Sequence, residues 1–163
     1  MKMSKKVSVL FVCLGNICRS PTAHGVFRNM VREAGLEDVI DVDSAGTAAF
    51  HIGKSPDSRS VQVAKERGID MTDLRARQVD LGDFYQYDYV LAMDEANFFN
   101  LKEVALPEHY EQIELFLSYS EDFSEKEVPD PYYGGAQGFD HVFDLVESAS
   151  KGLLQAIKKT HLS

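Results

Sequence analysis

The chain has 163 residues, of which 44% are hydrophobic, so it can build one compact core but is too short for two ordinary domains. We therefore expect a single domain over residues 1–163. The formal net charge of −9 disfavours polyanions, so neither nucleic acid nor an anionic membrane is expected as a partner. The basic residues 1–6 precede an apolar run too short for a signal peptide or a membrane span, which predicts a cytoplasmic protein.

Hydrophobic patterning predicts strands that alternate with helices. Residues 7–12 form an apolar, β-branched run typical of a strand buried in a parallel sheet. Ser20-Pro21 then starts a helix whose apolar residues recur at helical spacing until Gly35. The later predicted elements are strands over 39–44, 76–79, 87–93 and 113–116 and helices over 57–67, 95–104 and 139–159. This order predicts an α/β fold, a single doubly wound domain with an about four-stranded parallel sheet flanked by helices.

The loop between the first strand and the first helix, residues 13–20, has the sequence Cys-Leu-Gly-Asn-Ile-Cys-Arg-Ser. Ligands bind at such positions in open α/β sheets, and a helix N-terminus offers N–H donors to a tetrahedral anion such as phosphate. Gly15 and Asn16 accept the strained backbone angles that a tightly curled loop needs. The partial positive charge of the helix N-terminus favours the thiolate of Cys13, which is a competent nucleophile. Arg19 adds a planar guanidinium that can bind two phosphoryl oxygens. A bare Cys-x5-Arg match could equally be a buried cysteine beside a solvated arginine, but the flanking strand, Gly-Asn pair and Ser-Pro helix start favour catalysis.

Residues 12–21, Val-Cys-Leu-Gly-Asn-Ile-Cys-Arg-Ser-Pro, resemble the phosphate-binding loop of the low-molecular-weight protein tyrosine phosphatases. Further motifs follow in that family's order: Asp43-Ser-Ala-Gly-Thr47, Arg75-Ala-Arg-Gln78, Met93-Asp94 and Asp130-Pro-Tyr-Tyr-Gly134. The resemblance implies hydrolysis of phosphotyrosine through a phosphocysteine on Cys13, without a cofactor, with tyrosine-phosphorylated proteins as partners and a monomer or weak dimer as the assembly. The residues that it implies bind the phosphoryl group beside Arg19 are Leu14, Gly15, Asn16, Ile17, Cys18 and Ser20.

Phosphoryl transfer to a thiolate requires a proton for the leaving oxygen and later a base for the attacking water. An Asp-Pro pair is by itself an ordinary turn start, but the resemblance implies that Asp130 is the general acid and then the base. It also places Tyr132 and Tyr133 at the mouth of the cleft and Phe50 on the opposite wall, with the substrate ring between Phe50 and Tyr132. The competing interpretations are surface aromatics for the two tyrosines and a core residue for Phe50.

Two supporting contacts are expected around the loop. Ser20 can either cap the first helix or donate its hydroxyl to the Cys13 sulfur, and the resemblance favours the second role. In the family, a serine and a histidine from neighbouring loops hold the asparagine that corresponds to Asn16. Ser44 matches the serine, whereas Leu74 stands where many members have the histidine, so that second contact is expected to be missing.

The sequence contains two cysteines, Cys13 and Cys18, which lie five residues apart and predict a redox-sensitive site in which mild oxidation joins them. None of the five histidines forms a metal-ligand pattern, so no metal is expected.

Three other functions compete with the phosphotyrosine interpretation. A non-catalytic phosphopeptide-binding module would use the same loop but would need neither a thiol at Cys13 nor an acid at Asp130. A protein arginine phosphatase on this fold carries threonine at the position of Ile17, and the isoleucine here favours an aryl ester. A thioredoxin-coupled arsenate reductase relays oxidation through further cysteines, which this chain lacks.

Overall fold

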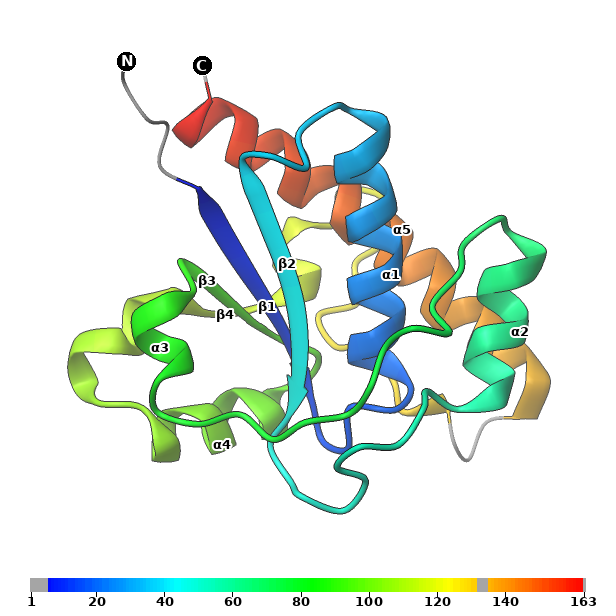
Figure 1. Cartoon of the computed structure of the whole chain (residues 1–163), viewed down its shortest axis with the longest axis horizontal. Helices are drawn as coiled ribbons and strands as arrows, with labels where there is room; N and C mark the ends of the chain where they lie inside the picture. The colour runs from blue at the N-terminus through cyan, green and yellow to red at the C-terminus, as the bar shows by residue number, and fades with distance from the viewer. Residues whose placement is uncertain (1–5, 132–134, 163) are drawn as a thin grey trace.

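The computed structural model describes residues 6–131 and 135–162. Its sheet has four parallel strands in the order β2-β1-β3-β4, which confirms the predicted α/β architecture. The strands are β1 (Val7–Cys13), β2 (Ile40–Gly46), β3 (Tyr89–Ala92) and β4 (Ile113–Leu115). The strands β1 and β2 end side by side, with Cys13 opposite Gly46, so their carboxyl ends form one edge of the sheet (Figure 1).

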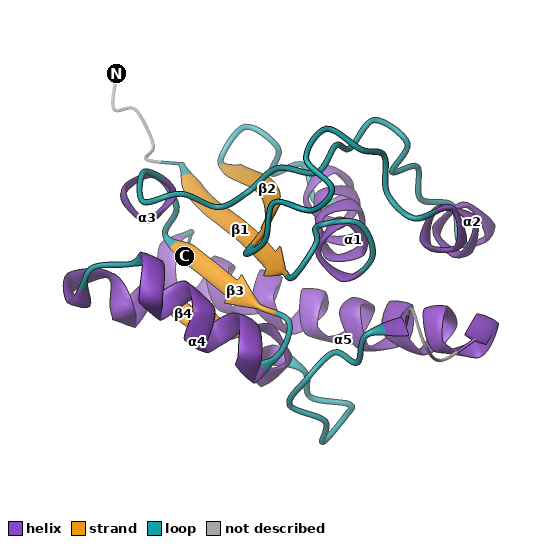
Figure 2. Ribbon diagram, turned by 90° about the horizontal axis from the view of Figure 1, so that it is seen from below, coloured by secondary structure: helices purple, strands orange, loops and turns teal. Residues whose placement is uncertain are grey.

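Helices cover both faces of this sheet. The α-helices are α1 (Arg19–Glu33), α2 (Ser58–Glu66), α3 (Asp83–Gln86), α4 (Glu95–Val104) and α5 (Gly135–His161). Two 3₁₀ helices, η1 (Pro107–Gln112) and η2 (Phe116–Tyr119), flank β4. In Figure 2, α1 and α2 lie on one side of the strands and α3 and α4 lie on the other. No described helix has the length and apolar character needed to cross a membrane.

The central strand β1 explains why two separate cores form. Val9 and Phe11 belong to the cluster that α1 and α5 complete, whereas Leu10 and Val12 belong to the cluster completed by α3 and α4. Successive side chains of a strand point to opposite faces, so a strand between two helical layers must be apolar on both. This burial fixes the end of β1, and therefore Cys13, at the sheet edge.

The predicted strand over 76–79 is wrong. This segment makes only one isolated bridge, between Gly46 and Gln78, and otherwise runs as a loop. Its remaining amides bind elsewhere, because the Ala76 N–H donates to the Lys54 carbonyl and the Arg77 N–H donates to the Asn16 side chain. The last helix was also predicted too short, since α5 begins at Gly135 instead of residue 139.

Candidate active site

The loop between β1 and α1 curls back over the Cys13 sulfur. Asn16 has a φ of 57°, in the left-handed region that asparagine adopts at low cost, and its N–H donates to the Cys13 Sγ at 3.3 Å. The Asn16 side chain donates from Nδ2 to the Ser20 Oγ at 2.7 Å. The loop is therefore closed by its own contacts, with one backbone donor aimed at the sulfur.

Ser20 contacts the nucleophile and does not cap the helix. Its Oγ lies 3.1 Å from the Cys13 Sγ and 3.4 Å from the Ala45 carbonyl oxygen, and the side chain is fully buried. The N-cap residue of α1 is Cys18, which makes no side-chain capping bond. Of the two interpretations open for Ser20, the geometry favours the contact with sulfur. A hydroxyl here can donate to a thiolate.

Arg19 is held by an acidic partner, Asp94, from the connection between β3 and α4. Its Nη1 donates to the Asp94 Oδ2 at 2.6 Å and to the Val128 carbonyl at 3.0 Å, and the residue is only 5% exposed. Burial alone would lower the pKa of Arg19, but the negative charge at Cys13 and the Asp94 carboxylate outweigh it and raise the pKa above its ordinary value. The guanidinium therefore stays charged at the loop's end.

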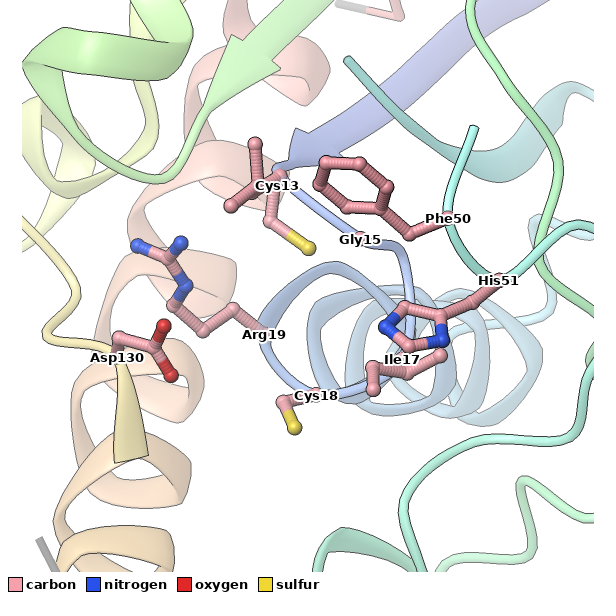
Figure 3. A pocket seen from close by; sticks show the side chains of 9 residues that line it. Cys13, Gly15, Ile17, Cys18, Arg19, Phe50, His51 and Asp130 are labelled. Atoms are coloured by element: carbon pink, nitrogen blue, oxygen red, sulfur yellow. The ribbon is translucent and has the colours of Figure 1, made fainter. Parts of the chain in front are cut away.

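A cavity of about 210 Å³ opens above this loop. Its lining residues are Cys13, Leu14, Gly15, Ile17, Cys18, Arg19, Phe50, His51 and Asp130. Figure 3 shows Arg19 and Asp130 on one side of the Cys13 sulfur and Phe50 and His51 on the other. Phe50 is 72% exposed, which excludes the core interpretation of this residue. Tyr132 and Tyr133, expected at the mouth, lie outside the described residues.

The two cysteines differ in their surroundings. Burial, assisted by the negative charge of Asp57, raises the pKa of the Cys18 thiol to about 12, so this residue remains a thiol at neutral pH. Cys13 instead has the Asn16 N–H and the Ser20 hydroxyl close to its sulfur. The geometry therefore supports Cys13, and not Cys18, as the residue that can act as a thiolate.

The expected contact between Ser44 and Asn16 is not the one that forms. The Ser44 Oγ is bonded to His24 Nδ1 at 2.9 Å, and the Asn16 Oδ1 accepts from the Arg77 N–H at 3.0 Å. His24 lies in the second turn of α1 and Ser44 in β2, so this bond joins the helix to the strand. Burial lowers the pKa of His24 to about 4, so the imidazole is neutral near pH 7. Leu74, at the position of the missing histidine, packs in the core.

Arg77 takes the supporting role by fixing its own backbone. Its guanidinium binds both oxygens of Asp83 at 3.0 Å and the Asp43 Oδ2 at 3.1 Å. Burial alone would lower the pKa of Arg77, but the Asp83 and Asp43 carboxylates raise it above its ordinary value. Planar bidentate pairs are geometrically specific. The anchored side chain therefore holds the N–H that supports Asn16.

A family model described as low molecular weight phosphotyrosine protein phosphatase matches residues 8–162. The chain belongs to this family. A low molecular weight phosphotyrosine protein phosphatase of Schizosaccharomyces pombe is 44% identical, over 95% of this chain and 99% of that protein. A crystal structure of a protein tyrosine phosphatase from Entamoeba histolytica superposes with a TM-score of 0.91 at 38% identity, covering 94% and 98% of the two chains. An arginine phosphatase from Drosophila superposes with a TM-score of 0.85 at 34% identity, covering 92% and 97%.

Within this phosphatase family member, sequence reasoning found the residues with chemistry of their own and missed those that position them. Asp94 and Arg77 lie in motifs that resemble the family, but no role was predicted for either. His24 and His51 were considered only as metal ligands. A partial signal existed for Asp94, because this acidic residue directly follows the apolar residues 90–93, but none existed for Arg77.

Proposed function

We propose that the chain is a protein tyrosine phosphatase that hydrolyses phosphotyrosine monoesters through a phosphocysteine on Cys13. The observation that carries this proposal is the joint placement of the Cys13 sulfur, the Arg19 guanidinium and the Asp130 carboxyl around one cavity (Figure 3). A nucleophile, an anion clamp and a proton donor are the three groups that this chemistry needs. Binding alone would not require the thiol or the acid.

In the first step, the Cys13 thiolate attacks phosphorus, the S–P bond forms and the bond from phosphorus to the tyrosyl oxygen breaks. Asp130 gives its proton to that leaving oxygen, so that neutral tyrosine departs. Arg19 and the loop N–H groups, including those of Leu14, Gly15, Ile17 and Cys18, bind the equatorial oxygens as their charge develops. The buried contact to Asp94 keeps the guanidinium in place for this step.

In the second step, water attacks the phosphocysteine, Asp130 accepts the water proton and the P–S bond breaks to release inorganic phosphate. The departing group is the Cys13 thiolate, and its charge is stabilised by the Ser20 hydroxyl at 3.1 Å and the Asn16 N–H at 3.3 Å. Apart from the substrate and one water, both steps use protein groups alone, so the proposed reaction requires no cofactor.

The proposed substrates are tyrosine-phosphorylated proteins. Ile17 and the exposed ring of Phe50 present apolar surface to the cavity, which suits an aryl ester better than a guanidinium-linked phosphate. Phosphoserine has its phosphorus closer to the backbone, which leaves it short of Cys13 in a cleft walled by Phe50 and, in this proposal, by Tyr132 and Tyr133. We expect kcat/KM for phosphotyrosine peptides to exceed that for matched phosphoserine or phosphoarginine peptides by at least about 10²-fold. A preference for phosphoarginine would overturn the substrate assignment and leave the mechanism intact.

The proposal also comprises one domain over residues 1–163, present in the cytoplasm as a monomer or weak dimer.

Turnover of p-nitrophenyl phosphate tests the catalytic part directly. Cys13→Ser should abolish turnover and still bind phosphate, because the substitution removes the nucleophile and keeps the N–H cradle. Asp130→Ala should lower the turnover rate by roughly two to four orders of magnitude with a phenol-like leaving group and far less with an activated leaving group. Activity of Cys13→Ser within tenfold of the unmodified protein would refute the assignment.

A further inference from the structure

His51 lies in the catalytic cavity without any role in the proposed reaction. It follows Phe50 on the wall opposite Asp130 (Figure 3) and is half-buried. Its ring makes no hydrogen bond within residues 6–131 and 135–162, in contrast to the imidazoles of His24 and His109. An imidazole carries at least one N–H donor in either protonation state. The cavity wall therefore contains a donor that no residue in the described part of the chain uses.

The His51 ring rests on Gly15. A Cβ placed on this glycine would lie 2.9 Å from the His51 Cδ2 and 3.6 Å from its Nε2, so a larger residue here would displace the ring from its position. The same position is 3.8 Å from the Ile17 Cγ1. The N–H of Asn16 points at the Cys13 sulfur, whereas the Cβ direction of Gly15 points at His51. The ring therefore lies on the outer side of the loop, beside the phosphoryl site and not facing it.

The segment that carries His51 is fixed at both ends. Near β2, the Thr47 and Ala48 N–H groups donate to the Cys13 and Leu14 carbonyls at 2.9 and 3.0 Å. At the other end, the Gly53 N–H donates to the Ala76 carbonyl and the Lys54 N–H closes a turn onto the His51 carbonyl. A side chain on a segment tied in this way has a defined position relative to the phosphate loop, which a specificity residue requires.

We propose that His51 is a specificity-determining residue that binds an acidic side chain next to the phosphotyrosine of the substrate. This inference rests on the proposed function. With the tyrosyl ring against Phe50, a neighbouring substrate residue falls beside His51, because these two rings are adjacent, with centroids 6.4 Å apart. Because His51 lies on the outer side of the loop, its ring can reach a substrate residue that flanks the phosphotyrosine.

The charges around the cavity favour a carboxylate on this wall. Lys54 is exposed on the same turn as His51, and the Asp57 carboxylate, next along the chain, is bound by Arg59 at 2.9 Å. A substrate carboxylate is therefore attracted toward the wall that carries His51 and Lys54, an arrangement that orients the bound peptide.

The test compares two phosphotyrosine peptides that differ only in having glutamate or glutamine beside the phosphotyrosine. At low ionic strength, we expect the unmodified protein to show a kcat/KM about threefold to fivefold higher for the glutamate peptide, as for a partly exposed charge pair. In His51→Gln the ratio should fall to about one. His51→Arg keeps a group that can carry a positive charge, which glutamine lacks, and should retain the ratio. Lys54→Gln is the matched control, an exposed cation removed from the same turn, and it should lower the ratio less than His51→Gln does.

Each outcome bears on a distinct part of the inference. A ratio of one in the unmodified protein overturns it, and so does a ratio that Lys54→Gln removes as fully as His51→Gln does. An equal loss with both peptides in His51→Gln would place the ring on the phosphoryl group and refute contact with a flanking acid. Turnover of p-nitrophenyl phosphate, which has no flanking residue, separates the two proposals: its absence refutes the proposed function and the inference with it, whereas its presence with a ratio of one refutes the inference alone.

Discussion

Asp94 uses its two carboxylate oxygens for different tasks, which makes it a sharp test of how Arg19 is positioned. The Oδ2 accepts from the Arg19 Nη1 at 2.6 Å, while the Oδ1 accepts from the Asn97 N–H at 2.7 Å and caps α4. The two side chains of the ion pair are 6% and 22% exposed. Without the carboxylate, the buried guanidinium would retain the Val128 carbonyl as its neutral partner.

Asp94→Asn removes the charge and keeps an oxygen that can cap the helix, whereas Asp94→Ala removes both. Loss of one partner of a buried ion pair costs about 3–5 kcal/mol, and the partial exposure of Asp94 favours the lower end of that range. Loss of an N-cap adds about 1 kcal/mol. We therefore expect the free energy of unfolding to fall by about 3 kcal/mol in Asp94→Asn and by about 4 kcal/mol in Asp94→Ala.

The same substitutions should lower activity, because Arg19 binds the phosphoryl group only if its fork is aimed at the loop. We expect kcat/KM for p-nitrophenyl phosphate to fall about 10²-fold, which corresponds to about 2.7 kcal/mol of transition-state stabilisation. Urea unfolding and steady-state kinetics on both variants measure the two effects separately. A fall in stability with kcat/KM within threefold of the unmodified protein would show that Arg19 does not depend on Asp94. Unchanged stability in Asp94→Asn would show that the buried pair contributes nothing to folding.

Three further predictions concern other parts of the molecule. The pKa of His24 is lowered from 6.5 to about 4, so as the pH falls the unfolded chain binds the proton before the folded chain does. The stability that this neutral histidine contributes is present above pH 6.5 and is lost toward pH 4, by about 3 kcal/mol in all. Urea unfolding of His24→Gln should lack this loss of stability between pH 6.5 and pH 4. Peroxide should oxidise Cys13 to a sulfenic acid that condenses with the Cys18 thiol, releasing water and forming a disulfide; inactivation that thiols reverse as fully in Cys18→Ser would contradict this role. A Cβ at Gly152 would overlap the Tyr119 carbonyl, so Gly152→Ala should lower the free energy of unfolding by about 3 kcal/mol or more, whereas Gly138→Ala, with 3.6 Å to its nearest neighbour, should not.

The sheet could be predicted from sequence because its strands carry their own signal. Residues 7–12 are apolar on both faces, and burial between two helical layers requires that pattern. The segment over 76–79, Ala-Arg-Gln-Val, has only two apolar residues, and its Arg77 N–H binds a side chain of the phosphate loop instead of a strand. Composition reports burial, whereas strand pairing depends on where each N–H and carbonyl finds its partner. For the segment over 76–79, those partners are distant in sequence.

The candidate site divides in the same way. Cys13, Arg19 and Asp130 could be predicted because their residue types and local sequence point to phosphoryl chemistry. Asp94 could not be assigned a partner, because it lies 75 positions from Arg19 and the contact exists only once β1 and β3 pair. His51 was missed because nothing in the sequence reveals that its ring lies on Gly15. Long-range contacts of this kind depend on the fold and leave no local pattern.

The support of Asn16 shows how this chain can dispense with the histidine that Leu74 replaces. Catalysis benefits when donors are aligned before the substrate arrives, because no reorganisation is then needed as charge develops. Asn16 meets this requirement with its Nδ2 on Ser20 and its Oδ1 on the Arg77 N–H, so both ends of its amide are occupied. The Arg77 backbone is in turn held by the bidentate contact of its own guanidinium with Asp83. The loop is therefore fixed through backbone hydrogen bonding from a neighbouring segment. Both polar ends of the Asn16 side chain have partners although position 74 is a leucine.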